Sequence, residues 1–282
     1  MNSIIEARNV CMDFAIGDGS IVHALKGINL QIPPNRLSVL RGRSGSGKTT
    51  LINILGALDR PTSGEVMFLE DGRDITKLPD KERDRLRRVD MAFVFQSVAL
   101  ISTMTAFENV EFALRLTKLP YKERVERARQ SLIQVGLEKR MDHRPGEMSG
   151  GEQQRVAIAR ALITNPAVIF ADEPTGNLDA GSAKTVAEML SKASQRYDQT
   201  IIMVTHDRQM ADYADSPWNR VAAMINADFW DVRSEERRVG KEGRSGGPRN
   251  HKKKKTPHNT PPPPPPPPPL PPATSPRPAA PA

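Results

Sequence analysis

The sequence predicts an α/β fold built around a mainly parallel sheet. Short apolar segments alternate with longer segments in which apolar residues recur at helical spacing, and this alternation is typical of strand–helix–strand units. Residues 167–171 are entirely apolar and residues 200–205 mostly so, which indicates strands that are buried on both faces. A glycine-rich segment at residues 42–47 separates a predicted strand from a predicted helix, as a ligand-binding loop does in such a fold.

The predicted elements can be placed in order along the chain. Three strands come first, and turn signals at residues 17–19 and 33–35 separate them. After the glycine-rich loop, helices and strands follow one another as far as residue 205. Strands are expected at residues 4–10, 24–32, 36–40, 64–68, 91–95, 167–171 and 200–205, and helices at residues 49–58, 79–89, 106–135, 152–162 and 182–196.

The chain has 282 residues and a formal net charge of +8, but one end carries that charge. Residues 233–282 contain 11 of the 41 Lys and Arg residues, 3 of the 33 Asp and Glu residues and 16 of the 25 prolines. The rest of the chain is neutral, so its charge gives no reason to expect nucleic-acid binding. Cys11 is the single cysteine, which excludes a disulfide within the chain. No stretch approaches the roughly 20 apolar residues of a membrane-spanning helix, so we expect contact with a membrane only through a partner.

Residues 233–282 are expected to be a disordered, basic and proline-rich tail without a function. Residues 233–242 read RSEERRVGKE, which matches the translation of a widely used sequencing adapter over ten consecutive codons. Runs of lysine at 252–255 and of proline at 261–269 follow. A basic patch for anionic partners and a polyproline ligand are the alternative interpretations. We favour a sequencing artefact because the match is specific, and a segment of this composition cannot bury a core in any case.

Residues 42–49 (GRSGSGKT) form a complete phosphate-loop pattern, G-x-x-x-x-G-K-T. The glycines let backbone N–H groups converge on phosphate oxygens at the start of a helix, whose positive end favours an anion. Lys48 would bring a positive charge to the β- and γ-phosphates of a nucleotide, and the hydroxyl of Thr49 would bind Mg²⁺. A turn that only connects two elements is the alternative, but the position between a strand and a helix favours phosphate binding.

Two carboxylates follow the buried strand at residues 167–171. Because ligand sites of α/β folds lie at the carboxyl ends of the strands, Asp172 and Glu173 are expected beside the phosphate loop. Asp172 would hold Mg²⁺, and Glu173 would act as the general base toward the attacking water. Two solvated acids at a strand end are the alternative, which the presence of a phosphate loop makes the weaker interpretation.

Residues 149–153 (SGGEQ), followed by QRVAIARA, carry a resemblance to a known family. They resemble the signature sequence of ABC ATPases, with Met148 in place of the usual leucine. The resemblance covers about residues 4–215. It implies a P-loop NTPase (RecA-like) core with a mainly parallel sheet, an N-terminal antiparallel β subdomain and a helical signature subdomain at about residues 97–160, all within an ATPase domain of residues 1–232.

The resemblance also assigns roles to single residues. Ser149 and its two glycines would cap the γ-phosphate of ATP held by the opposite subunit. Gln96 resembles the Q-loop glutamine, which contacts Mg²⁺ or water, and His206 resembles the switch histidine, which contacts the γ-phosphate. Phe14 stands where an aromatic residue stacks on adenine, with a core position as the alternative. Asp179 closes a segment that resembles the D-loop, which crosses the dimer interface.

The candidate site residues fall into three groups. The expected nucleotide-binding residues are Phe14, Gly42, Arg43, Ser44, Gly45, Ser46, Gly47, Lys48, Thr49, Thr50, Ser149, Gly150, Gly151 and Asp179. The expected catalytic residues are Gln96, Glu173 and His206, and the expected Mg²⁺ ligands are Thr49, Gln96 and Asp172.

Three segments, FVFQSVALISTMTAFENV, MSGGEQQRVAIARAL and ADEPTGNLD, look like the lipoprotein-releasing and macrolide-export ATPases within this family. The resemblance implies a chain that hydrolyses ATP, forms a homodimer on binding ATP and drives a separate membrane permease from the cytoplasmic face of the plasma membrane. Residues 216–219 (SPWN) interrupt the family pattern, so the last pair of strands usual in the family is not predicted.

Three other classes of protein are less compatible with the sequence. A DNA-repair or chromosome-maintenance ATPase shares the motifs but needs a long coiled coil between residues 49 and 148, and this interval lacks sustained heptads. A translation factor with tandem cassettes would contain each motif twice, whereas this chain contains each once. A non-enzymatic binding protein with a basic, proline-rich arm would require the tail to be genuine.

Overall fold

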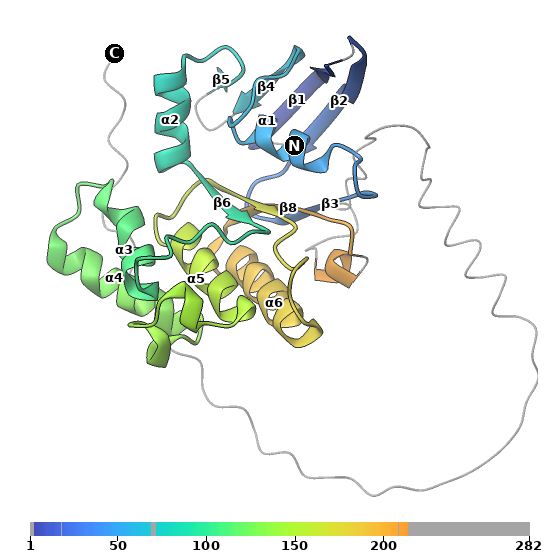
Figure 1. The fold of residues 1–282 in the computed structure, drawn as a ribbon. Coiled ribbons are helices and arrows are strands. Elements are labelled where there is room, and N and C mark those ends of the chain that lie inside the picture. Colours follow the sequence, from blue (N-terminus) through green and yellow to red (C-terminus); the bar gives the residue numbers. More distant parts are fainter. Residues whose placement is uncertain (1–2, 18, 69–71, 208, 214–282) are drawn as a thin grey trace, which may run out of the picture. The chain divides into compact units, whose positions relative to one another are not determined.

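The computed structural model describes residues 3–17, 19–68, 72–207 and 209–213 (Figure 1). The tail predicted at residues 233–282 and the interruption predicted at residues 216–219 lie outside the described residues. Within the described residues, the strands form two four-stranded sheets with helices packed against them.

The first sheet is antiparallel, with the strand order β2-β1-β4-β5. Its strands are β1 (Ile5–Ala15), β2 (Ile21–Ile32), β4 (Ser63–Phe68) and β5 (Arg73–Asp74). Strands β1 and β2 are longer than the predicted strands because register shifts between Ala7 and Asp13 break the alternation on which sequence prediction depends. Strand β5 was not predicted, since two residues carry no readable alternation.

The second sheet is parallel throughout, with the order β3-β8-β7-β6. Its strands are β3 (Leu37–Arg41), β8 (Thr200–Thr205), β7 (Val168–Asp172) and β6 (Met91–Phe95). Strands β7 and β8 are buried on both faces, as their apolar composition predicts. Phe95 is in register with Asp172, and Asp172 with Val204, so the carboxyl ends of β6, β7 and β8 lie at one edge of the sheet.

Helices cover both faces of the parallel sheet (Figure 1). Helix α1 (Lys48–Leu55) packs between the two sheets, where Leu51 and Leu55 share a core with both. Helices α5 (Gly150–Leu162) and α6 (Ala180–Tyr197) cover the opposite face. Helix α1 ends before the predicted residue 58 because Gly56 forms its C-cap. The predicted α/β class with an antiparallel N-terminal sheet is confirmed.

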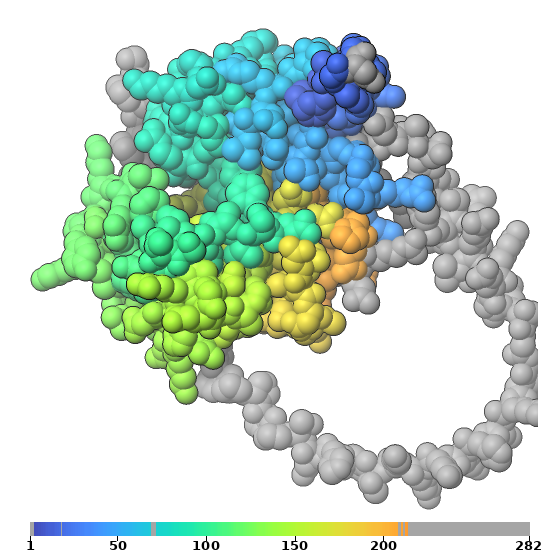
Figure 2. Space-filling model, viewed as in Figure 1, coloured from blue at the N-terminus to red at the C-terminus, as the bar shows by residue number. Residues whose placement is uncertain are grey.

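Helices α3 (Ala106–Arg115) and α4 (Tyr121–Gln134) share a core with the side chains of Val156 and Ala159 from α5. The helical pattern predicted at residues 106–135 is divided into these two helices. Residues 116–120 separate the two helices, and Pro120, which has no N–H to donate, is the N-cap of α4. Figure 2 shows α3 and α4 (green) on a part of the visible surface apart from β1 and β2 of the antiparallel sheet (blue). The remaining helices are α2 (Asp80–Val89) and the short η1 (Glu138–Arg140), η2 (Pro145–Glu147) and η3 (Gln209–Tyr213).

Candidate active site

The phosphate loop, residues 42–47, joins β3 to α1. Gly45 and Gly47 have φ angles of 75° and 85°, a left-handed conformation that favours glycine. Gly47 is the N-cap of α1 and offers no side chain to the first N–H groups of the helix. The Oγ atom of Ser46 is buried and has no hydrogen-bond partner within the described residues. Unpaired donors at a helix start and an orphaned hydroxyl both fit a bound phosphate.

The loop encloses the side chain of its own lysine. The Nζ atom of Lys48 donates to the carbonyl oxygens of Gly42, at 3.0 Å, and Arg43, at 2.9 Å, and only 5% of the residue is exposed. The same Nζ lies 3.6 Å from Oε1 of Glu173. The two carbonyls thus hold the Lys48 side chain in place inside the loop that is expected to bind phosphate. Arg43 and Ser44 belong to the loop, and Thr50 lies in the first turn of α1.

Thr49 of α1 and Asp172 of β7 form a direct contact, although β8 lies between β7 and β3, the strand that leads into the phosphate loop. The Oγ1 atom of Thr49 donates to Oδ1 of Asp172 at 3.3 Å. Burial raises the pKa of Asp172, and the hydrogen bond from Thr49 acts against this rise. A hydroxyl and a carboxylate are the hard oxygen donors that Mg²⁺ takes beside nucleotide phosphates, so the residues present fit this ion. A divalent cation here would keep the Asp172 carboxylate ionised.

Glu173 stands between a cation and an imidazole. Its Oε1 faces Nζ of Lys48, and its Oε2 pairs with Nδ1 of His206. Its backbone has a φ of 47°, a left-handed conformation that costs a non-glycine residue about 1–3 kcal/mol. Two backbone hydrogen bonds hold it there, from its N–H to the oxygen of Val204 at 2.9 Å and from the N–H of Gly176 to its oxygen at 3.0 Å. The fold thus fixes this carboxylate by its main chain as well as its side chain.

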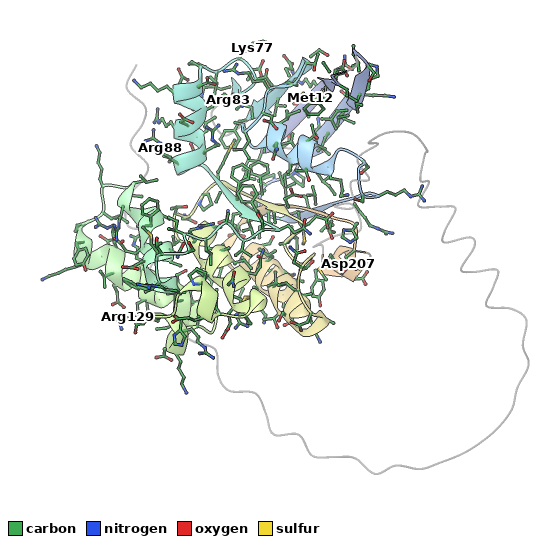
Figure 3. All side chains as sticks on the ribbon, in the orientation of Figure 1. Met12, Lys77, Arg83, Arg88, Arg129 and Asp207 are labelled. Atoms are coloured by element: carbon green, nitrogen blue, oxygen red, sulfur yellow. The ribbon has the colours of Figure 1, made fainter. Side chains whose placement is uncertain are left out.

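Gln96 and His206 follow the ends of β6 and β8, as predicted. His206 lines an open cavity together with Glu173, Thr205 and Asp207, and Figure 3 shows Asp207 just after the end of β8. The side chain of Gln96 makes its contacts with Asn177 rather than with these residues. Contacts therefore join Lys48, Thr49, Asp172, Glu173 and His206 into one group, with Gln96 at the same edge of the sheet.

The signature residues begin α5. Ser149 is the N-cap: its Oγ accepts from the N–H of Glu152 at 3.3 Å, and the carboxylate of Glu152 accepts from the N–H of Ser149 at 2.8 Å. Gly151 lies so close to α6 that an added Cβ would be 2.5 Å from Oγ of Ser182. Asp179 caps α6 by accepting from the N–H of Ser182 at 3.0 Å. In the described part of the chain, these contacts of Ser149 are local, and its helix lies on the face of the sheet opposite α1.

Phe14 lies on β1 opposite Val22, and 44% of it is exposed. A core position, the alternative that the sequence left open, is therefore excluded. The ring is accessible to a flat ligand, as stacking on a base requires.

Residues 25–176 match the family model described as ABC transporter. The chain belongs to the ABC transporter family. Over 228 residues it is 41% identical to the lipoprotein-releasing system ATP-binding protein LolD of Geobacter metallireducens, and the match covers 81% of this chain and 100% of LolD. It is 45% identical over 221 residues to the macrolide export ATP-binding/permease protein MacB of Wolinella succinogenes, covering 78% of this chain and 33% of MacB. A solved dimeric ATP-binding cassette in a post-hydrolysis state, bound to ADP and phosphate, has a TM-score of 0.69 at 40% identity, covering 75% of this chain and 91% of that one.

This ABC chain is an ATP-binding, ATP-hydrolysing transporter subunit, and the predicted likeness to lipoprotein-releasing and macrolide-export ATPases is confirmed. Among the helices of the described residues, none has the length and apolar character to cross a membrane.

Two contacts near the ABC site escaped prediction. Asn177 pairs with Gln96, and nothing in the segment GNLD indicates which residue its amide would face. Arg160 of α5 donates from Nη1 to the oxygen of Ala99 at 2.7 Å and from Nη2 to the oxygen of Val98 at 3.4 Å. An arginine within the apolar run VAIARAL was a signal that its guanidinium has a partner, since an unpaired guanidinium is costly to remove from water.

Proposed function

We propose that this chain hydrolyses Mg²⁺–ATP as a homodimer and thereby drives a separate membrane permease of the lipoprotein-release or macrolide-export kind. One observation carries the proposal: the Glu173 carboxylate lies between the Lys48 ammonium and the His206 imidazole, directly beside the phosphate loop. A carboxylate in this position can accept a proton from water next to the terminal phosphate of a bound nucleotide.

Binding and hydrolysis would use different groups. The loop N–H groups and Lys48 would hold the β- and γ-phosphates, Phe14 would stack on adenine, and Thr49, Asp172 and Gln96 would hold Mg²⁺. When bound, Mg²⁺ would neutralise part of the phosphate charge.

In the hydrolytic step, Glu173 would take the proton of the attacking water. A bond forms between the water oxygen and the γ-phosphorus, while the bond from that phosphorus to ADP breaks and its electron pair remains on the ADP oxygen. The Nζ atom of Lys48 lies 3.6 Å from Oε1 of the same carboxylate. His206 orients the carboxylate through Oε2 and would contact the γ-phosphate with its other ring nitrogen.

The proposed dimer follows from the position of the signature. Ser149 starts a helix on the face of the sheet opposite α1, so we infer that Ser149, Gly150 and Gly151 act on nucleotide held by a second copy. The relative with a similar solved structure is dimeric and holds ADP and phosphate. The γ-phosphate would then gain donors only in the closed pair, and this differential affinity is what can shift an open–closed equilibrium.

A membrane partner is proposed from the relatives. LolD is named as the ATP-binding protein of a lipoprotein-releasing system, and MacB as both ATP-binding protein and permease. This chain would therefore sit peripherally on the cytoplasmic face of the inner membrane and bind a permease encoded separately. No nucleic-acid partner is expected.

The test uses Glu173→Gln, which removes the base but keeps the shape of the side chain. We expect ATP binding to persist, hydrolysis to slow by about 10²–10⁴-fold, and a stable dimer to form with ATP and Mg²⁺ but not with ADP. Light scattering measures the dimer, and a circular-dichroism melt shows that the variant is folded. A folded variant that binds ATP yet stays monomeric at high protein concentration and low salt would remove the dimer from the mechanism. Near-normal turnover would remove Glu173 from the role of base.

A further inference from the structure

Two loops meet at the edge of the sheet that carries the candidate site. Gln96 follows β6, and Gly176 and Asn177 lie in the turn after β7, and these two strands are direct neighbours in the parallel sheet. The Nε2 atom of Gln96 donates to Oδ1 of Asn177 at 3.2 Å, and Nδ2 of Asn177 donates to the backbone oxygen of Gln96 at 3.4 Å. The two residues therefore form a reciprocal pair of hydrogen bonds.

This pair of hydrogen bonds determines the orientation of the oxygen and the NH₂ group in the side-chain amides of Gln96 and Asn177. A backbone carbonyl can only accept, so the group of Asn177 that faces the oxygen of Gln96 must be its NH₂ group. The oxygen of the Asn177 amide then faces Gln96, and the group that it meets must be the NH₂ group of Gln96. The carbonyl oxygen Oε1 of Gln96 is thereby left as the end that Asn177 does not engage. Only that end of a glutamine amide can bind a cation.

The absence of a side chain at Gly176 leaves room for the Gln96 amide in this orientation. An added Cβ would lie 2.8 Å from Nε2 of Gln96. Its φ is not among the positive values found in the described residues, so backbone conformation does not require a glycine here. The requirement is the space that the Gln96 amide occupies.

We propose that Asn177 is a positioning residue for Gln96: it holds the glutamine amide in the one orientation that presents oxygen rather than NH₂ to Mg²⁺. Gly176 provides the space for that orientation. The inference rests on the proposed role of Gln96 as a Mg²⁺ ligand, and it gives the turn after β7 a function within its own subunit.

The experiment measures the affinity of the protein for a non-hydrolysable ATP analogue, once in the presence of Mg²⁺ and once in the presence of EDTA. The measurement does not depend on ATP hydrolysis. The Mg²⁺-dependent gain is the ratio of the affinity measured with Mg²⁺ to that measured with EDTA. We expect Asn177→Ala to reduce this gain by about 3- to 10-fold. This factor corresponds to the loss of one neutral hydrogen bond, and it reaches the low end of what is lost when a residue that orients a metal ligand is removed. Gly176→Ala should have a similar effect. Gly146→Ala, at a position where an added Cβ meets nothing within 4 Å, is the matched control and should have none.

Repeating the Asn177→Ala substitution in a Gln96→Glu variant separates an effect on the orientation of the residue 96 side chain from a general effect on the structure. Gln96→Glu places an oxygen at both ends of the side chain, so either orientation can bind the cation. In this background Asn177→Ala should cause no loss of the Mg²⁺-dependent gain. An equal loss in both backgrounds would show a merely structural role and overturn the inference, as would no loss in either.

The proposed role of Gln96 is tested separately by Gln96→Ala. If this variant keeps the full Mg²⁺-dependent gain, Gln96 is not a Mg²⁺ ligand. The role that the proposed function gives to Gln96 is then wrong, and so is the inference about Asn177. If Gln96→Ala loses the gain but Asn177→Ala does not, the ligand role stands and the inference alone is wrong.

Discussion

Replacing Arg160 with methionine should destabilise the protein by about 2 kcal/mol. The side chain of this residue reaches from α5 to the carbonyl oxygens of Val98 and Ala99, which follow Gln96 in the chain. Both residues have positive φ, 60° and 49°, a conformation that alanine and a β-branched valine rarely adopt. The guanidinium thus holds a strained turn in place. Methionine keeps the apolar stem of the side chain and removes only the charged end.

The magnitude follows from the two bonds. The bond to Ala99, at 2.7 Å, is charge-assisted and worth about 1.5–3 kcal/mol, whereas the bond to Val98 is long, at 3.4 Å, and adds little. Ala99 is exposed, so water can replace part of the lost interaction. Relief of strain at the two residues offsets a further part. Both effects lower the loss of unfolding free energy below the upper end of this range, to about 2 kcal/mol.

Urea denaturation followed by circular dichroism measures this loss, provided that the slope of the transition is unchanged. Arg129→Met is the control, because Arg129 is exposed and points outward from α4 in Figure 3. It should change the unfolding free energy by no more than about 0.5 kcal/mol. Arg160→Lys should fall between the two, since an ammonium has no planar fork to reach both carbonyls. If Arg160→Met costs no more than Arg129→Met, the guanidinium does not hold the turn.

Two further predictions concern charge. Lys48→Ala should weaken ATP binding by about 10²-fold or more, because a nearly buried cation is removed from the phosphate loop; unchanged affinity in a nucleotide titration would show that the loop does not hold phosphate. Burial alone would raise the pKa of Glu111, but hydrogen bonds from Arg115 and Arg124 outweigh it and lower the pKa below its ordinary value. The stability that this carboxylate contributes is therefore present above the ordinary Glu pKa of about 4.3 and is lost as the pH falls below it. Glu111→Gln should cost about 2 kcal/mol at pH 7 and less at pH 4 in urea unfolding, and a cost independent of pH would contradict this assignment.

The sequence was most informative where chemistry and topology coincide. Parallel strands end at one edge of a sheet, so a phosphate loop after one strand and two acids after another had to come close. The contact of Thr49 with Asp172 and the approach of Lys48 to Glu173 follow from that rule. The antiparallel sheet was also expected, but the bulges in β1 hid its true length from a pattern of period two.

Other features depend on packing that a single sequence does not display. The break between α3 and α4 was not predicted because the apolar spacing continues through residues 116–120, and Pro120 alone marked the boundary. The left-handed backbone of Glu173 was not predictable from its residue type, since glutamate rarely adopts it. It depends on hydrogen bonds to a neighbouring strand and to the following turn, which exist only once the sheet has formed.

The helix that begins with the signature also fixes the segment that carries Gln96. Gln154 of α5 donates to the carbonyl oxygen of Phe95 at 3.3 Å, just before Gln96, and Arg160 of the same helix binds the carbonyls just after it. Both attachments are to the main chain, so they constrain position rather than side-chain chemistry. An α-helix is stiff along its axis, because each turn is hydrogen-bonded to the next. A shift of α5 at Ser149 would therefore have to move this segment or break its bonds to Gln154 and Arg160. Ser149 and Gln96, about 50 residues apart in the sequence, are thus connected through the bonds that Gln154 and Arg160 make to the main chain around Gln96.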